Sequence, residues 1–275
     1  MTNETAVLLS VDERGVAHLC LNRPEVHNAF DDIVIQELIE ALNEVSENKA
    51  AKVLVLSANG KSFCAGADLN WMRKMAAYSY EENKKDADQL ARLFSTLYHL
   101  NKPTLAKVQG SVFGGGVGLV ACCDMAIGSK LSKFCLSEVK LGLVPATISP
   151  YVVEAIGPRQ AKRYFTTAEV FSSRRARRLG LLSEAVSEDE LDQTVDNIVS
   201  AILNNGPVAV ASAKALVNEI KYQAIDQALI NSTSELIASV RVSDEGQEGL
   251  SAFLEKRQPS WKTNQGSAVN TNSKA

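Results

Sequence analysis

The 275-residue sequence has no long apolar run, no excess of basic charge and few histidines. No stretch approaches the roughly 18–20 apolar residues of a membrane-spanning helix, and the first residues lack the basic start and apolar core of a signal peptide. Lys and Arg number 29 against 32 Asp and Glu, a net charge of −3, so no nucleic-acid-binding surface is indicated. We therefore expect a cytoplasmic protein that binds neither a membrane nor nucleic acid.

Patterns typical of metal sites and disulfides are also missing. The three histidines are scattered, and the five cysteines follow neither CxxC nor any other metal-ligand spacing. We expect no metal site, and we interpret the cysteines as buried thiols in a reducing compartment. An anionic ligand would have to be held by local cations or by backbone N–H groups.

Hydrophobic periodicity predicts an α/β protein. Strands are predicted at 7–11, 17–21, 52–57, 104–108, 125–128 and 133–135, and helices at 30–45, 81–100 and 116–123. Strands that alternate with helices favour largely parallel pairing. After about residue 186 only helical patterns follow, at 188–203, 207–222, 225–240 and 249–257. We expect a core domain over 1–200 that holds the active site, a helical region over 201–262 and a disordered tail at 263–275.

Two segments of small residues follow predicted strands and open helices. They are residues 62–69 (SFCAGADL) and 109–116 (QGSVFGGG). A helix start exposes backbone N–H groups, and glycine lets a ligand approach the main chain. Two such starts can present two donors to one oxygen, as in an oxyanion hole. The second segment has neither the lysine of a phosphate-binding loop nor the spacing of a dinucleotide fingerprint, and the first could be only a tight strand-to-helix turn.

Glu138 is the candidate acid or base. It lies between apolar Leu136 and Val139, just after a predicted strand. Burial of such a carboxylate raises its pKa toward the range that is useful for proton transfer. The alternative is a solvated loop glutamate or one that pairs with Lys140.

Taken together, these segments resemble the crotonase superfamily of enoyl-CoA hydratases and isomerases. The resemblance covers roughly residues 7–262. It lies in Asn22-Arg23-Pro24 with Asn28-Ala29, Phe63 to Leu69, Gly114-Gly115-Gly116, Cys123-Asp124, Phe134 with Glu138 and Gly142, Ala176 with Leu179-Gly180-Leu181, and Ala252 to Arg257. It implies a spiral of ββα units, a helical C-terminal part that forms trimers, and trimers that stack into hexamers.

The resemblance also implies an acyl-CoA substrate, with no cofactor beyond the coenzyme A that the substrate carries. It places the thioester oxygen between the N–H groups of Ala67 and Gly115, with Glu138 as the acid/base. The substrate-binding residues that it implies are Arg23, His27, Ala29, Ala65, Gly66, Asp68, Leu69, Gly114, Gly118, Phe253 and Lys256.

Within that set the expected roles differ. The adenine is expected near Ala65 and Leu69, and the phosphates near Arg23, His27 and Lys256, with Phe253 alongside. Arg23 could equally be a surface charge and Lys256 a solvated helix residue. Asp68 could be proposed as a second acid, but its place at a helix start favours an N-cap.

Gly118 departs from the family pattern, because typical hydratases of the family carry a second glutamate there. In one interpretation Glu138 alone activates water and passes the proton to C2, which makes a hydratase. In another it moves a proton between carbons, which makes a Δ3,Δ2-enoyl-CoA isomerase. A third is a CoA-binding protein that has lost catalysis. We also expect Gly118 to leave room for a branch such as a 3-methyl group.

The segment 137–151 favours hydration. It resembles bacterial 3-methylglutaconyl-CoA or γ-carboxygeranoyl-CoA hydratases of leucine and isoprenoid breakdown, whose substrates carry a distal carboxylate. The candidate cations for that carboxylate are Arg73, Lys140 and Arg163. Residues 146–149 replace a glycine-rich run that many family members have. The side chains that could line the pocket, or equally belong to the core, are Trp71, Met72 and Tyr151.

Overall fold

The computed structural model describes residues 5–263. The chain divides into two compact units, a sheet unit (Met1–Ile198) and a helical unit (Val199–Ala275). The division falls inside one helix, α8 (Glu188–Leu203). The predicted tail at 263–275 lies outside the described residues, except that Thr263 ends a short helix.

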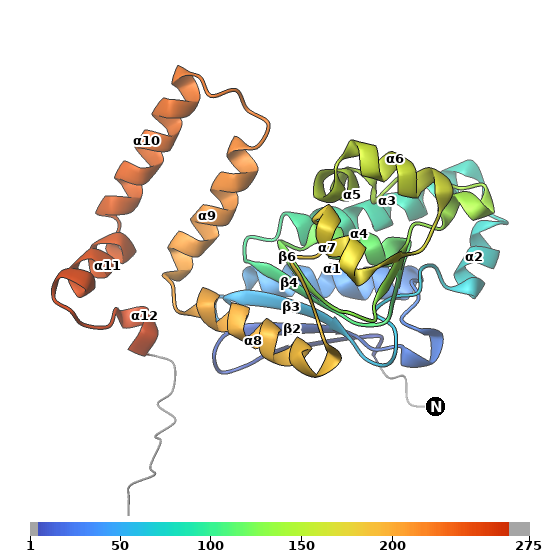
Figure 1. Cartoon of the computed structure of the whole chain (residues 1–275), viewed down its shortest axis with the longest axis horizontal. Coiled ribbons are helices and arrows are strands. Elements are labelled where there is room, and N and C mark those ends of the chain that lie inside the picture. Colours follow the sequence, from blue (N-terminus) through green and yellow to red (C-terminus); the bar gives the residue numbers. More distant parts are fainter. Residues whose placement is uncertain (1–4, 264–275) are drawn as a thin grey trace, which may run out of the picture. The chain divides into compact units, whose positions relative to one another are not determined.

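The sheet unit contains two sheets (Figure 1). The six-stranded sheet has the order β1-β2-β3-β4-β6-β9, in which only the β1–β2 pair is antiparallel. The smaller sheet has the order β5-β7-β8, and β5 pairs with β7 in parallel. The strands are β1 (Val7–Val11), β2 (Val16–Leu21), β3 (Val53–Ala58), β4 (Thr104–Val108), β5 (Ser111–Phe113), β6 (Met125–Ser129), β7 (Lys133–Cys135), β8 (Phe171–Ser172) and β9 (Glu184–Val186). The predicted α/β class with largely parallel pairing is confirmed.

Helices cover the large sheet on both faces, which explains why β3 is almost continuously apolar. Besides α8, the helices of this unit are α1 (Asp32–Glu47), α2 (Leu69–Met75), α3 (Tyr80–Tyr98), α4 (Gly115–Cys122), α5 (Ser149–Ile156), α6 (Pro158–Thr167) and α7 (Ser173–Leu179), with single turns at η1 (Pro24–Val26) and η2 (Glu138–Leu141). The sequence patterns did not predict α5, α6, α7, β5, β8 or β9.

Local capping explains where the predicted helices begin. The side chain of Asp31 accepts a hydrogen bond from the Val34 N–H at 2.9 Å and caps α1. Ser79 and Glu82 form a reciprocal capping box at the start of α3. The apolar stripe of α1, which includes Leu38, is buried against the sheet.

Helix α8 lies along the other face of the large sheet. Its Asp192 accepts a hydrogen bond from Lys107 of β4 at 2.8 Å, and its Asp196 one from Arg14 of the β1–β2 turn at 2.7 Å. Lys107 points away from its neighbours Ala106 and Val108, which belong to the main core. The sheet unit is therefore a three-layer arrangement with one dominant core between the sheet and α1, α3 and α4.

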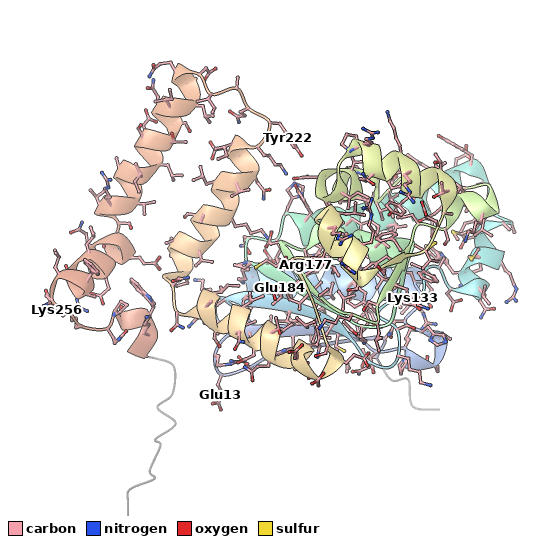
Figure 2. All side chains as sticks on the ribbon, viewed as in Figure 1. Glu13, Lys133, Arg177, Glu184, Tyr222 and Lys256 are labelled. Carbon is pink, nitrogen blue, oxygen red and sulfur yellow. The ribbon has the colours of Figure 1, made fainter. Side chains whose placement is uncertain are left out.

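The helical unit consists of the end of α8 together with α9 (Pro207–Ile220), α10 (Gln227–Val242), α11 (Asp244–Leu254) and α12 (Ser260–Thr263). Helices α9 and α10 run in opposite directions and are joined by an exposed loop that contains Tyr222 (Figures 1 and 2). The last predicted helix begins earlier than expected, because Ser243 caps α11. None of the helices within residues 5–263 is long and apolar enough to cross a lipid bilayer.

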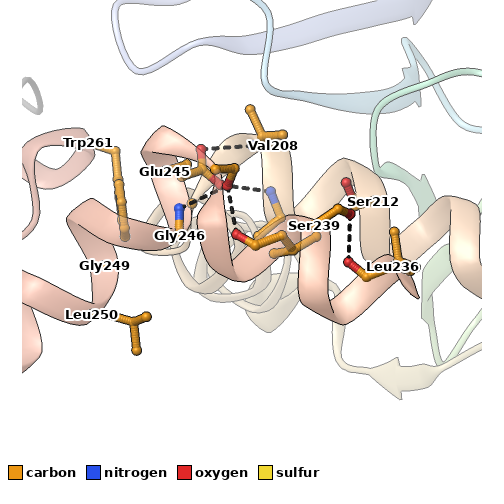
Figure 3. A pocket seen from close by; sticks show the side chains of 13 residues that line it. Val208, Ser212, Leu236, Ser239, Glu245, Gly246, Gly249, Leu250 and Trp261 are labelled. Atoms are coloured by element: carbon orange, nitrogen blue, oxygen red, sulfur yellow. Dashed lines mark hydrogen bonds between the residues drawn. The ribbon is translucent and has the colours of Figure 1, made fainter. Parts of the chain in front are cut away.

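A cavity of about 480 Å³ lies within the helical unit, between α9, α10, α11 and α12 (Figure 3). Its wall includes Leu236, Leu250 and Trp261, and the carboxylate of Glu245 accepts hydrogen bonds from the first turn of α9. None of the predicted site residues lines this cavity.

Candidate active site

Main-chain hydrogen bonds join the first small-residue segment to the second. The Cys64 N–H donates to the Ser111 carbonyl at 3.1 Å, and the Phe113 N–H donates to the Cys64 carbonyl at 2.8 Å. These bonds form a parallel bridge between Cys64 and Val112 of β5. Two segments almost fifty residues apart therefore end side by side.

The same small sheet brings Glu138 to the second segment. Strand β7 pairs with β5, and the Gly114 N–H donates to the Cys135 carbonyl at 2.9 Å. The Oε1 atom of Glu138 lies 3.3 Å from the position that a Cβ atom on Gly114 would occupy, and the Cα atom of Gly66 lies 3.9 Å from it. Both glycine segments and the candidate acid thus converge at Gly114.

The two predicted N–H donors are unpaired. Neither Ala67 nor Gly115 has a hydrogen-bond acceptor for its N–H group among residues 5–263. Ala67 is exposed, and Gly115 is half-buried at the first turn of α4. The neighbours of Ala67 are held by the main chain of Phe30, so that the Ala67 N–H is left free. Two unpaired N–H groups of this kind can donate hydrogen bonds to the oxygen atom of a ligand.

Glu138 has the environment of an acid/base group. It lies at the start of η2 and is half-buried, and its Oε2 atom is buried without a hydrogen-bond partner among the described residues. Burial raises the pKa of Glu138 above its ordinary value. The alternative pairing with Lys140 is not present among the ion pairs of the described residues, so the carboxylate is available for proton transfer.

The expectation that Gly118 leaves room for a substrate branch is wrong. A Cβ atom on Gly118 would lie 2.3 Å from Cγ2 of Ile148 and 2.8 Å from Cε1 of Phe94, and Gly118 itself is buried. The space beside Gly118 is therefore filled by two apolar side chains. Ile148 comes from the segment that replaces the family's glycine-rich run.

The Arg23 guanidinium, which was expected to bind phosphate, already has hydrogen-bond partners within the protein. It donates to Asp31 at 2.5 Å and to Asp68 at 3.4 Å, and also to the Ala29 carbonyl at 3.3 Å. Two carboxylates already neutralise the charge, so a phosphate would have to share it. The surface-charge alternative is also incorrect, because the Arg23 side chain is only 22% exposed.

Asp68 caps α2, as the sequence analysis favoured. Its carboxylate accepts hydrogen bonds from the Asn70 N–H at 2.8 Å and the Trp71 N–H at 3.2 Å. Together with its Arg23 contact, this leaves Asp68 in a structural role rather than that of a second acid.

The remaining predicted contacts of the coenzyme fall into two groups. In the sheet unit, the carbonyl of His27 accepts the Ala65 N–H at 3.0 Å, and Leu69 is 68% exposed at the start of α2. In the helical unit, Phe253 is 81% exposed, and Lys256 projects from the turn after α11 (Figure 2). Their roles in binding stay predictions.

Two of the three candidate pocket residues, Trp71 and Tyr151, contact α3. The indole N–H of Trp71 donates to Asp86 at 3.1 Å, and Trp71 is only 4% exposed. Tyr151 packs on Phe94, with ring centroids 6.2 Å apart. These contacts favour the core interpretation for Trp71 and Tyr151, whereas Met72 is half-buried.

All five cysteines are free thiols. Cys64, Cys122 and Cys135 are buried, while Cys20 and Cys123 are half-buried. Burial raises the pKa of the Cys64 thiol to about 12. Although Cys64 lies in the first glycine segment, its thiol is protonated at neutral pH and is a poor nucleophile.

Sequence reasoning missed three apolar residues that shape the site: Phe30, Phe94 and Ile148. Each is at most 2% exposed. Their only signal in the sequence is hydrophobicity, which predicts burial but not which motif a side chain will touch.

Comparison with known proteins agrees with this geometry. The family pattern "Enoyl-CoA hydratase/isomerase" matches residues 12–264. The crystal structure of an enoyl-CoA hydratase from Shewanella pealeana is similar, with a TM-score of 0.90 and 47% identity over 93% of this chain and 96% of that one. The crotonyl-CoA hydratase of Syntrophomonas wolfei is 33% identical over 253 residues, 91% of this chain and 95% of the relative. The 2,3-dehydroadipyl-CoA hydratase of Escherichia coli is 28% identical over 252 residues, 91% of this chain and 96% of the relative.

Fold and site thus define an α/β enzyme of the crotonase superfamily. Within that superfamily the chain belongs to the enoyl-CoA hydratase/isomerase family.

Proposed function

We propose that this protein adds water across the C2–C3 double bond of an enoyl-CoA. Glu138 is the acid/base, and the N–H groups of Ala67 and Gly115 hold the thioester oxygen. The observation that carries the proposal is that the Glu138 carboxylate and Gly66, the neighbour of Ala67, both lie close to Gly114, the neighbour of Gly115. Within residues 5–263 the Oε2 atom of Glu138 is buried without a partner, and the N–H groups of Ala67 and Gly115 are unpaired. The family to which the chain belongs supports the same substrate class.

In the proposed reaction, a water oxygen bonds to C3 while one of its protons passes to Glu138. The π electrons of the C2–C3 bond move toward the thioester oxygen, where the two N–H donors stabilise the developing negative charge. Glu138 then returns the proton to C2. Its raised pKa helps it to hold the proton between the two steps, and these steps require no cofactor beyond the coenzyme A that the substrate carries.

We propose that the substrate carries a distal carboxylate, as 3-methylglutaconyl-CoA does. Its 3-methyl branch would have to lie elsewhere than beside Gly118, where Ile148 and Phe94 fill the space. The name of the Escherichia coli relative, 2,3-dehydroadipyl-CoA hydratase, describes a carboxylated enoyl-CoA. Of the three candidate cations, Arg163 is held by Glu169 at 2.5 Å. Arg73 and Lys140 are exposed and have no ion-pair partner within the described part of the chain. We therefore assign the distal carboxylate to Arg73 or Lys140.

A panel of 2-enoyl-CoAs with and without a distal carboxylate tests both proposals. We expect a 3-hydroxyacyl-CoA product by mass spectrometry, and a higher kcat/KM for the carboxylated members. Arg73→Gln and Lys140→Gln are compared with Arg163→Gln as the matched control. Absence of a 3-hydroxyacyl product from every member would rule out hydration, whereas equal kcat/KM across the panel would rule out only the carboxylate.

A single-glutamate Δ3,Δ2-enoyl-CoA isomerase is the second candidate. The filled space beside Gly118 favours it, because no second carboxylate can stand there. Incubation with a 3-enoyl-CoA distinguishes the two: conversion to the 2-enoyl isomer that stops there indicates an isomerase. A protein that only binds CoA would show neither product, and its Glu138→Ala variant would behave like the wild type.

We further propose that the chain forms homotrimers that stack into hexamers, and that it acts in the cytoplasm. Helices α9 and α10 contain no buried residue in the single chain. Apolar side chains on them are exposed to solvent, among them Val217 at 62% and Ile237 at 48%. Apolar helix faces of this kind are typical of interfaces. Sedimentation analysis should give the mass of three or six chains, and a monomer at micromolar concentration would contradict the assembly.

A further inference from the structure

Phe30 contacts both halves of the proposed oxyanion site. It lies just before α1 and is 2% exposed. Its N–H donates to the Gly66 carbonyl at 2.8 Å, and its carbonyl accepts the Asp68 N–H at 2.7 Å. The two bonds bracket Ala67, which forms a parallel bridge with Phe30. In such a bridge the bracketed residue turns its own N–H away from the partner strand, so the main chain of Phe30 directs the Ala67 N–H outward.

The ring of Phe30 packs on the other donor. A Cβ atom on Gly115 would lie 2.6 Å from Cε2 and 2.8 Å from Cδ2 of this ring, and 3.7 Å from Cζ of Phe94. The ring therefore lies against the first turn of α4 at a distance that only glycine permits. Gly115 is held between two buried aromatic rings, and its N–H has little freedom to move.

We propose that Phe30 is a positioning residue for this site. Its main chain fixes the direction of the Ala67 N–H, and its ring fixes the position of the Gly115 N–H. This inference rests on the proposed function, in which Ala67 and Gly115 polarise a thioester carbonyl. Donors of an oxyanion hole act only when they are fixed before the charge develops. A shift of about 1 Å in a positioned group can cost roughly 100-fold in rate, so loss of the ring should reduce catalysis without loss of a reacting group.

The test uses Phe30→Leu and Phe30→Met in the full-length protein. The control is Phe171→Leu, which also shortens a buried aromatic residue but lies in β8, where it packs on Phe134 and Tyr164. The probe is butyryl-CoA labelled with ¹³C at the thioester carbon, which binds but has no double bond to hydrate. The carbonyl chemical shift of the saturated complex reports how strongly the two donors polarise the oxygen.

We expect the wild type to move the carbonyl resonance downfield, both Phe30 variants to lose part of that shift, and Phe171→Leu to retain it. With an enoyl-CoA substrate, kcat should fall about 10- to 100-fold in the Phe30 variants, while KM changes by less than about threefold. Circular dichroism verifies that each variant is folded. Phe30→Met, whose longer and more flexible side chain adapts to the space that the ring leaves, decides the result if Phe30→Leu does not fold.

Three results overturn the proposal. If both the carbonyl shift and kcat of the Phe30 variants equal those of the wild type, or if Phe171→Leu loses as much, Phe30 has no positioning role and the proposed function stands. If butyryl-CoA binds to the wild type with no carbonyl shift, the oxyanion site itself is wrong and the inference fails with it.

Discussion

Gly118→Ala should destabilise the protein, although alanine normally favours a helix. The new Cβ atom would lie 2.3 Å from Cγ2 of Ile148 and 2.8 Å from Cε1 of Phe94. Overpacking of a well-packed core costs about 1–3 kcal/mol, while replacement of a helical glycine by alanine returns about 1 kcal/mol. Two side chains must move, so the upper end of the cost applies. The net loss is then about 2 kcal/mol.

A second substitution isolates the contact with Ile148. Ile148→Ala removes Cγ2 and should cost about 2–5 kcal/mol alone, but it makes room for the methyl group of Gly118→Ala. The double variant should therefore be more stable than the sum of the two single effects by about 1–3 kcal/mol. Ile148→Val keeps Cγ2 and loses only the terminal methyl group, so it should give almost no such coupling and is the matched control.

Urea and thermal unfolding at one fixed protein concentration measure these differences. The Gly118→Ala variant should melt roughly 4–8 °C below the wild type. If the Gly118→Ala and Ile148→Ala effects add within about 0.5 kcal/mol, Ile148 does not fill the space beside Gly118, and steric exclusion of a second carboxylate by Ile148 is refuted.

Glu138→Gln should lower kcat by about 100- to 10,000-fold with little effect on CoA-ester binding, and wild-type turnover by this variant would contradict that role. The raised pKa of Glu138 means that folding favours its protonated form. The protonated side chain therefore contributes to stability below the ordinary pKa of 4.5, and this contribution to the free energy of unfolding is lost as pH rises through the folded-state pKa. Glu138→Gln should therefore raise Tm relative to the wild type at about pH 8 and not at about pH 4, and kcat/KM of the wild type should rise with pH through a pKa above 4.5. Lys102→Met should destabilise the protein by roughly 2 kcal/mol, because the Lys102 ammonium donates to carbonyl groups at the end of α1, among them that of Asn48 at 2.7 Å. Urea unfolding checks this, with exposed Lys49→Met as control; equal effects of the two variants would exclude the cap. Gly118→Glu should express as a poorly folded protein unless Ile148→Ala is added, and an active, stable single variant would contradict the close packing of Ile148 and Phe94 on Gly118.

Features that depend on neighbouring residues could be read from the sequence. The helix pattern, the cap by Asp68 and the helix starts after the glycine segments rest on contacts between residues at most four positions apart. Strands are recognisable because their buried residues alternate along the chain. The glycine segments and Glu138 were recognisable as candidate chemistry because their residue types and local context are unusual. Such local signals survive in a single sequence, since the interacting groups are adjacent along the chain.

Features that depend on packing were decided only by the tertiary structure. Nothing near Gly118 in the sequence indicates that Ile148, thirty residues later, fills the space beside it, and the expected room for a substrate branch was wrong for that reason. Likewise, the sequence alone suggests that Arg23 is a free cation, whereas in the structure it pairs with Asp31 and Asp68. The physical reason is that a contact between distant residues depends on how whole elements pack, and hydrophobicity alone specifies burial without a partner. The sequence by itself therefore determined the α/β pattern, the candidate groups and the absence of a second glutamate at position 118. The fold decided that Ile148 and Phe94 fill the space beside Gly118, and that Phe30 contacts both Ala67 and Gly115.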